Sequence, residues 1–350
     1  MAEKLTNKST HVSSIARFSF ERCDIIKSLF EQRCNEEELP FETLEDDSLR
    51  VIDGDMEVRF TACGQDCAFH IVATRQLDLI EICSTITEGL AQIDPSLSKL
   101  SWSHAADTLD SPDCLTLATI IEREAIGCSW WRLVLEVSPV EITKFLGAHW
   151  HVQVLRPGRP GRDPVWPVVN AHGLVEWPTG QNELSRRVFT IRSVDQSKNT
   201  ISLDIYRHDR GSSCRWAETV LIGDVIGLWG PSGRRGPEGH SILVGGDETA
   251  VPAILRALGT LPPTTTGCAV LMVGDEGDVQ PNPSNQIAIK WLFRARGDDL
   301  VAVFCETPMP APDANLWFAA SQEQARAVRE HARGDRALER SQIKALTYWS

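Results

Sequence analysis

The sequence has 350 residues, which is long for one hydrophobic core and favours two or three domains. Hydrophobic residues make up 42% and charged residues 24%, as in ordinary globular proteins, and no apolar run reaches the length of a membrane helix. The net charge of -13 argues against nucleic-acid binding, which needs a basic surface.

The charge is unevenly distributed along the chain. Residues 1–120 carry 10 Lys and Arg against 22 Asp and Glu, whereas the rest carries 25 against 26, so the first third is predicted to be a separate unit. The start of the chain, Met1–Thr6, lacks an apolar signal core, and the ten cysteines have no framework spacing. We therefore expect a cytoplasmic protein. Cys63 and Cys67, the nearest pair, have no further zinc ligands nearby and are predicted to be buried thiols.

Residues 1–110 are predicted to form a small acidic α+β domain. Its expected strands are Thr10–Phe18, Leu49–Ile52, Met56–Ala62 and Ala68–Ala73, with a hairpin at Asp53-Gly54. Helical spacing covers Phe20–Arg33 and Leu77–Ile93, and the second helix has an apolar stripe at Leu77, Ile80, Ile82, Cys83, Ile86 and Leu90. His70, alone in a strand, is interpreted as structural.

After a linker at Ser101–Asp113, residues 114–237 consist of short strands separated by turn signals, a pattern that favours a closed antiparallel barrel. The Pro-, Gly- and Arg-rich stretch Pro157–Pro167 is predicted to be a loop, and a short helix follows Gly211. The expected strands are Leu115–Ala125, Trp130–Val137, Trp150–Leu155, Val188–Val194, Thr200–Tyr206 and Val225–Trp229.

In residues 240–350 strands alternate with helices, which predicts a parallel α/β sheet whose ligands bind at the carboxyl ends of strands. Gly245–Thr249 and Ser321 follow two such strands. The expected strands are Ile242–Val244, Cys268–Val273, Leu300–Phe304 and Leu316–Ala319, the helices are Ala250–Leu258 and Gln322–Ala332, and Gln286–Arg294 fits either type.

Two stretches have the residue types that a flat cofactor with a pyrophosphate requires. Arg187–Arg192 reads basic, any residue, aromatic, hydroxyl, apolar, basic, and alternation along a strand gives Arg187, Phe189 and Ile191 one face. The alternative is an ordinary half-buried strand with solvated arginines. The turn at Gly211–Ala217 opens a helix whose backbone N–H groups can hold a phosphate, although Ser212 or Ser213 can equally be a simple N-cap.

From about Cys114 to Trp349 the order of motifs resembles the siderophore-interacting proteins, which are flavin-dependent ferric-siderophore reductases. That resemblance implies a ferredoxin-reductase-like layout, with an antiparallel FAD-binding β-barrel followed by an NAD(P)H-binding-like α/β domain. The first domain resembles a small bacterial domain of unknown function and implies no chemistry. The motifs that carry the family resemblance are Trp150–Val154, Arg187–Arg192, Asp204, His208, Gly211–Ala217, Gly246–Ile254, Leu316–Ala319 and Tyr348-Trp349.

By that resemblance, FAD is the cofactor. Arg187 is expected at phosphate, Phe189 at the flavin ring and Thr190 at the ring nitrogen that accepts hydride. Asp247, Glu248 and Thr249 are expected to line the outer face of the flavin, and Tyr348 or Trp349 to cover the ring. The full set of expected cofactor residues is Arg187, Phe189, Thr190, Ile191, Arg192, His208, Ser212, Ser213, Cys214, Trp216, Asp247, Thr249, Ala250 and Trp349.

The expected substrate is a ferric siderophore. Such chelates are often anionic, so Arg207, Arg210, Arg294 and Arg296, with Arg192, are candidates to rim the cleft, although each can be a solvated surface residue. The electron donor is expected to be NAD(P)H or a ferredoxin-type protein, and the chain to be a monomer. We assign no general base and no metal ligands, because orientation and electrostatics are the protein's part in flavin chemistry.

Several positions depart from the family pattern. Phe189 replaces the usual Tyr, Cys214 replaces Ser and is a weaker donor, and Ala320-Ser321 replaces a Gly-Glu pair beside the nicotinamide site. Two alternatives therefore stay open. One is a flavin-dependent oxidoreductase with another acceptor, and the other is a binding or regulatory protein on the same fold.

Overall fold

The computed structural model describes residues 11–36, 39–105, 111–147, 149–158, 161–207, 212–233, 236–284 and 286–349. By their internal contacts these residues form two compact units. The first comprises Met1–Leu115 with Pro157–Leu184, and the second Thr116–Arg156 with Ser185–Ser350. No helix in the described ranges is long and apolar enough to cross a membrane.

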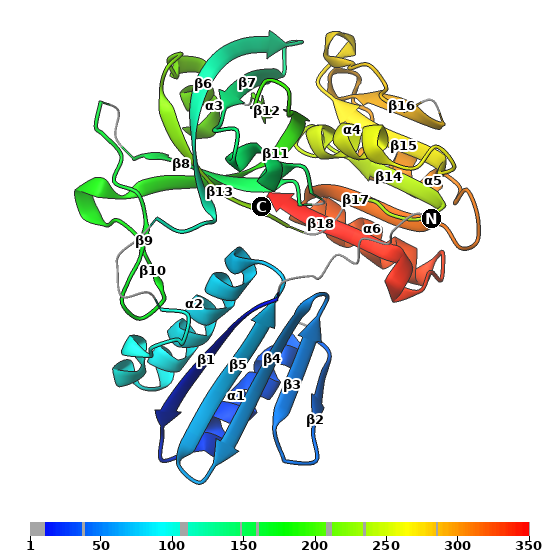
Figure 1. Ribbon diagram of the computed structural model, residues 1–350. Coiled ribbons are helices and arrows are strands. Elements are labelled where there is room, and N and C mark those ends of the chain that lie inside the picture. The colour runs from blue at the N-terminus through cyan, green and yellow to red at the C-terminus, as the bar shows by residue number, and fades with distance from the viewer. Residues whose placement is uncertain are drawn as a thin grey trace, which may run out of the picture. The chain divides into compact units, whose positions relative to one another are not determined.

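The first unit contains a five-stranded antiparallel sheet in the order β1-β5-β4-β3-β2, with two helices packed on it (Figure 1). The predicted α+β arrangement is confirmed, including the hairpin between the third and fourth strands. The short strand β2 was not predicted. The elements are β1 (Val12–Ser19), α1 (Cys23–Glu36), β2 (Phe41–Thr43), β3 (Leu49–Asp53), β4 (Met56–Cys63), β5 (Asp66–Ala73) and α2 (Gln76–Ile93).

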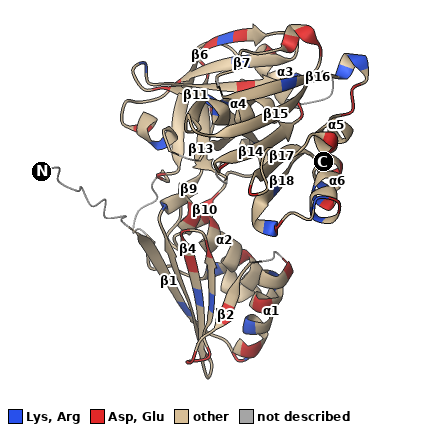
Figure 2. Cartoon of the chain, turned by 90° about the vertical axis from the view of Figure 1, so that its right-hand side faces the viewer, with Lys and Arg blue, Asp and Glu red and all other residues tan. Residues whose placement is uncertain are grey.

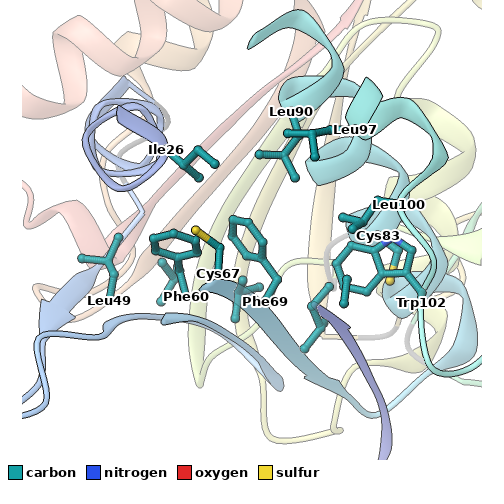
Figure 3. Packing of buried hydrophobic residues seen from close by; sticks show 14 of the residues in the cluster. Ile26, Leu49, Phe60, Cys67, Phe69, Cys83, Leu90, Leu97, Leu100 and Trp102 are labelled. Atoms are coloured by element: carbon teal, nitrogen blue, oxygen red, sulfur yellow. The ribbon is translucent and has the colours of Figure 1, made fainter. Parts of the chain in front are cut away.

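Alternation along these strands builds the core of the sheet. Figure 3 shows Phe60 and Phe69 of the strands facing Ile26 of α1 and Leu90 of α2. Trp102, almost fully buried at the edge of this cluster, donates from its indole N–H to the Thr87 hydroxyl at 3.0 Å. Burial of such aromatic side chains contributes about 2–3 kcal/mol each, so this unit has a core of its own.

The prediction of buried thiols is wrong for Cys63, and for Cys67 it is correct only in the burial of the side chain. Cys67 forms a disulfide with Cys23, 44 positions earlier, and Cys63 is an exposed free thiol. Ala62, not Cys63, pairs across from Cys67, and successive residues of a strand point to opposite faces. Cys67 therefore faces the helix side of the sheet while Cys63 faces away from it.

The acidic excess of the first third lies on the surface of this unit. Figure 2 shows charged residues, many of them acidic, along α1 and the strands of the sheet. Some are paired, since Arg50 bridges Glu42 at 3.0 Å and Glu57 at 3.2 Å. Such exposed pairs add little stability, so this surface is chiefly a solvated one.

A segment between two barrel strands also belongs to the first unit. It carries the small hairpin of β9 (Val168–Val169) and β10 (Val175–Glu176). The backbone N–H of Trp102 donates to the His172 carbonyl at 3.1 Å, and the His104 ring is bonded to the Gly173 carbonyl at 2.9 Å. The contacts thus group this segment with the N-terminal sheet. The domain boundaries 1–110, 114–237 and 240–350 stay a prediction.

The second unit begins with the predicted closed antiparallel barrel, in the strand order β11-β12-β7-β6-β13-β8. Its interior is filled by aliphatic side chains, among them Leu133, Val152, Ile191 and Leu203. Its elements are β6 (Leu115–Ile126), β7 (Trp130–Glu136), β8 (His151–Pro157), β11 (Leu184–Asp195), β12 (Thr200–Tyr206), α3 (Ser212–Thr219) and β13 (Val225–Ser232).

The rest of the second unit is the predicted parallel α/β sheet, in the order β16-β15-β14-β17-β18. The ambiguous stretch at 286–294 is a strand, and the C-terminal strand was not predicted. The elements are β14 (Ser241–Gly246), α4 (Val251–Thr260), β15 (Thr266–Val273), β16 (Ile287–Phe293), α5 (Leu300–Glu306), β17 (Asn315–Ser321), α6 (Gln322–Gly334) and β18 (Ile343–Trp349).

The prediction of a strand at Leu300–Phe304 is wrong, because this stretch is the start of α5. Asp299 accepts a hydrogen bond from the backbone N–H of Ala302 at 3.0 Å, which is an N-cap. Leu300 and Phe304, four residues apart, are both buried, as on one face of a helix. A run of five apolar residues fits both the two-residue period of a strand and the 3.6-residue period of a helix, so the sequence alone does not separate them.

Short 3-10 helices complete the described chain, and they lie at Pro95–Lys99, Glu141–Phe145, Gly180–Asn182, Glu276–Asp278, Arg294–Arg296 and Arg340–Gln342.

Candidate cofactor site

A pocket of about 430 Å³ lies within the second unit, where the barrel meets the parallel sheet. Its walls come from β8, β11, β12, the start of α3, the loop after β14 and the end of β18. Six members of the full set of expected cofactor residues line it, namely Arg187, Phe189, Thr190, Ser213, Cys214 and Thr249. Glu248 and Tyr348, which were also expected at the flavin, line it as well.

Strand β11 contributes four consecutive residues to the pocket wall, from Arg187 to Thr190. The Phe189 ring also packs against the barrel core, and Thr190 is 7% exposed. Arg187 is exposed, and its guanidinium donates to the carbonyl of Arg186 at 2.9 Å. Both faces of the strand therefore border the pocket. Ile191 points into the barrel core instead.

Arg192 does not line the pocket, unlike Arg187 in the same motif. Its guanidinium lies 3.7 Å from the buried Asp204 carboxylate, which also accepts two hydrogen bonds from Arg132 at 2.7 and 2.8 Å. Burial lowers the pKa of Arg192, and the Asp204 charge opposes that effect. Its buried Nε has no hydrogen-bond partner among the described residues. Arg192 thus supports the wall that Asp204 forms.

The start of α3 contributes Ser213 and Cys214 to the pocket. The Cys214 thiol donates to the Tyr206 carbonyl at 3.0 Å. Trp216 faces the barrel core instead, with the Arg156 guanidinium 5.0 Å from its ring centre. The predicted residues His208 and Arg210, and the side chain of Ser212, lie outside the described residues.

The loop after β14 is held by the buried Asp247 carboxylate. It accepts hydrogen bonds from the backbone N–H of Thr249 at 3.0 Å and from the Trp349 indole at 2.7 Å. Burial raises the pKa of Asp247, and these hydrogen bonds oppose the rise. Asp247, Trp349 and the fully buried Ala250 do not line the pocket, whereas Thr249 does. Asp247 and Trp349 therefore hold the loop in place through hydrogen bonds outside the pocket wall.

Two further residues of the pocket wall form a hydrogen-bonded pair. His151 Nε2 lies 3.1 Å from the hydroxyl of Tyr348, and the two rings meet edge to face. Burial lowers the pKa of His151, aided by the charges of Arg256 and His149. Burial raises the pKa of Tyr348, and a hydrogen bond with Thr190 opposes that rise. Of the two, Tyr348 was a candidate to cover the flavin ring, whereas His151 was signalled only as part of the motif Trp150–Val154.

This donor set fits a flavin. The Phe189 and Tyr348 rings provide flat apolar surface, and the Thr190 and Thr249 hydroxyl groups provide the few polar contacts that a ring system needs. The exposed guanidinium of Arg187 is free to meet a phosphate, since the bond it makes is to a neighbouring carbonyl. The volume lies in the range of small-molecule sites, about 300–1,000 Å³.

Comparison with known proteins identifies the family. Residues 119–235 match the family model of the siderophore-interacting FAD-binding domain, and residues 240–350 match that of the siderophore-interacting protein. The chain belongs to the siderophore-interacting protein family. Its barrel is the FAD-binding domain of that family, so FAD is its cofactor.

The individual proteins that this chain resembles share between about a quarter and a third of its residues in the matched regions. An uncharacterized protein of Mycobacterium tuberculosis is 34% identical over 119 residues, which are 33% of this chain and 42% of that protein. The NADPH-dependent ferric-chelate reductase of Escherichia coli is 25% identical over 66% of this chain and 91% of its own. The crystal structure of the siderophore-interacting protein SipS from Aeromonas hydrophila covers 67% of this chain and 91% of its own, with a TM-score of 0.55 and 25% identity.

None of the described arginines predicted to bind the siderophore lines the pocket of this family member. Arg294 makes a two-bond ion pair with the buried Glu248, at 2.7 Å each, and this pairing raises its pKa. Arg296 pairs with Glu276 and stacks over the Phe293 ring. A last candidate, Arg207, stacks over the ring of Trp131 at 4.9 Å.

Proposed function

We propose that this chain binds FAD in the pocket between the barrel and the parallel sheet and uses it to reduce ferric siderophores in the cytoplasm, releasing ferrous iron. The observation that carries the proposal is the pocket itself. It joins an aromatic wall, two hydroxyl groups and an exposed arginine in a chain of the siderophore-interacting family.

In this proposal the residues of the pocket have distinct tasks. Phe189 and Tyr348 flank the flavin ring, and the hydroxyl of Thr190 forms a hydrogen bond with the reactive edge of the ring. Arg187 and the backbone N–H groups at the start of α3, beside Ser213, hold the pyrophosphate.

The bound FAD supplies a carrier that takes two electrons and gives them up singly. Ferric iron in an oxygen cage is held as a hard cation, and reduction weakens that hold. The residues of the chain bind and orient the cofactor and limit water at the ring. No described side chain is required to act as a general base toward the siderophore.

The electron donor is NAD(P)H or a ferredoxin-type protein. The E. coli relative, whose name makes it NADPH-dependent, supports NADPH. Of the pair that departs from the family pattern, Ala320 is fully buried, and Ser321 accepts a hydrogen bond from the Gln324 backbone as the N-cap of α6. Neither provides a carboxylate, so a nucleotide has to be held by other groups.

The proposal is tested on purified protein reconstituted with FAD. We expect saturable FAD binding, bleaching of the flavin absorbance by NADPH, NADH or reduced ferredoxin under anaerobic conditions, and reoxidation by a ferric siderophore with ferrous iron trapped by a chelator. Reoxidation by quinone but not by ferric siderophore would favour an oxidoreductase with another acceptor. Absence of FAD binding would favour a non-catalytic protein. Gel filtration at working concentration checks the expected monomer.

A further inference from the structure

Three polar side chains line one wall of the pocket and form a short series from Thr190 on β11 through Tyr348 on β18 to His151 on β8. The hydroxyl of Tyr348 is hydrogen-bonded to His151, with an Nε2–Oη distance of 3.1 Å, and Thr190 lies on the same wall. All three residues line the cavity. The contact between Tyr348 and His151 spans 197 positions of the sequence.

The outer end of this series of side chains is His151, which is half-buried. Its Nδ1 lies against Gly233, because a Cβ built on that glycine would come within 2.4 Å of the nitrogen. Gly233 has φ +90°, a conformation that favours glycine, and its carbonyl is bonded to the ring of His149 at 2.7 Å. The glycine therefore leaves room for the imidazole between the pocket and the surface.

The proposed reaction requires a path for one proton. When two ferric ions are each reduced by one electron from anionic reduced FAD, the products are two ferrous ions, oxidised FAD and one proton. That proton leaves the ring nitrogen that hydride had reached. A side-chain route along the pocket wall offers this proton a path to the surface in addition to direct release to solvent.

We propose that Thr190, Tyr348 and His151 form a proton path that leads from the flavin edge to the surface beside Gly233. This inference rests on the proposed function and adds to it a route for protons. Tyr348 passes its hydroxyl proton to His151 Nε2 and receives another from the Thr190 side. His151 then loses the proton on Nδ1 toward solvent, so no net charge accumulates in the chain.

The groups around His151 favour its neutral imidazole, so this residue is suited to pass a proton on rather than to hold it. Among the described residues, the charged and titratable groups that face His151 are Arg256 on α4, His149 before β8 and Tyr348 on β18. Burial, together with the charges of Arg256 and His149, disfavours imidazolium. A proton that reaches His151 is therefore released readily. Tyr348 in turn stays a neutral phenol, able to donate and accept in the same step.

The test compares Tyr348→Phe, which keeps the ring and removes the hydroxyl, with His151→Asn and His151→Ala. His70→Asn, on the exposed side of the N-terminal sheet, is the control. Each FAD-loaded protein is reduced anaerobically, and its oxidation by a ferric siderophore is followed in H₂O and D₂O by stopped flow. We expect oxidation to slow about 10-fold or more in the three variants and not in the control. FAD affinity is measured for every variant, and the oxidation rates are compared at full FAD occupancy.

Two further readouts separate a proton path from a structural role. Added imidazole should restore much of the rate in His151→Ala, with no effect on Tyr348→Phe. In the protein without FAD, ¹⁵N spectra of the His151 ring should place its proton on Nδ1 and show a shift of the Nε2 signal in Tyr348→Phe. We also expect the wild-type protein to be oxidised more slowly in D₂O than in H₂O.

Wild-type oxidation rates in Tyr348→Phe and His151→Asn, or no rescue by imidazole, would overturn the proton path while leaving the reductase proposal standing. If the wild-type protein fails to bind FAD, or if its reduced flavin is not oxidised by the siderophore, the proposed function fails first. The two failures are thus distinguishable in one set of measurements.

Discussion

Replacing Arg187 with alanine is the sharpest test of the cofactor site. Its guanidinium is exposed and bonds to the carbonyl of its neighbour, so the substitution should leave the fold intact. A charge-assisted hydrogen bond contributes about 1.5–3 kcal/mol, which corresponds to a loss of about 10- to 100-fold in FAD affinity. Because the interaction is with a phosphate, the loss should be smaller at high salt.

The assay is titration of FAD against the apoprotein, followed by quenching of flavin fluorescence, at low and high salt. Arg186→Ala is a matched control, since Arg186 is the preceding residue, exposed on the same strand, but not in the pocket wall. We expect the control to bind FAD normally and both variants to melt at the wild-type temperature. Equal FAD affinity in Arg187→Ala and wild type would mean that the strand does not face the pyrophosphate, and the assignment of the pocket would be lost.

Three further predictions concern residues that hold the site together. Arg256→Met removes hydrogen bonds to two buried carbonyls at 2.8 and 3.0 Å, so we expect a loss of about 2 kcal/mol and a melting temperature about 4–8 °C lower by calorimetry. Arg294→Gln leaves the buried Glu248 without its partner and should cost about 2 kcal/mol, whereas Arg296→Gln should be nearly neutral by urea unfolding; equal effects would refute the distinction. Asp299→Ala removes the cap of α5 and should cost about 1 kcal/mol in the same assay, and no change would argue against the helix assignment.

Local patterns were sufficient for most of the fold. The strands of the barrel and the turn at Gly245–Thr249 were predicted because each has a periodicity and turn chemistry that a short window contains. The stretch at Leu300–Phe304 failed for the same reason, since five apolar residues fit a strand or a buried helix turn. Asp299 was the signal that would have decided it.

The site was predictable only where a motif carried it. Arg187 and Arg192 are both arginines on strand β11, but only Arg187 lines the pocket. Arg192 instead forms an ion pair with Asp204 on the neighbouring strand β12. The pairing of Cys23 with Cys67 likewise depends on how a helix packs on a sheet. Contacts of this kind are set by tertiary structure, which residue types along one segment do not encode. The same holds for His151 and its distant partner on the last strand.

The charge pairing beside the pocket affects how the proposed substrate, a ferric siderophore, would be recognised. A rim of unpaired arginines, as predicted from the sequence, would attract an anionic chelate over a long range. Instead Arg294 is committed to Glu248 and Arg296 to Glu276, so each positive charge is largely cancelled at the place where it was expected to act. The chain after residue 120 carries 25 Lys and Arg against 26 Asp and Glu, so its net charge provides no long-range attraction for an anion. For the proposed siderophore substrate we therefore expect recognition by shape and by aromatic surface near the flavin, rather than by electrostatic steering.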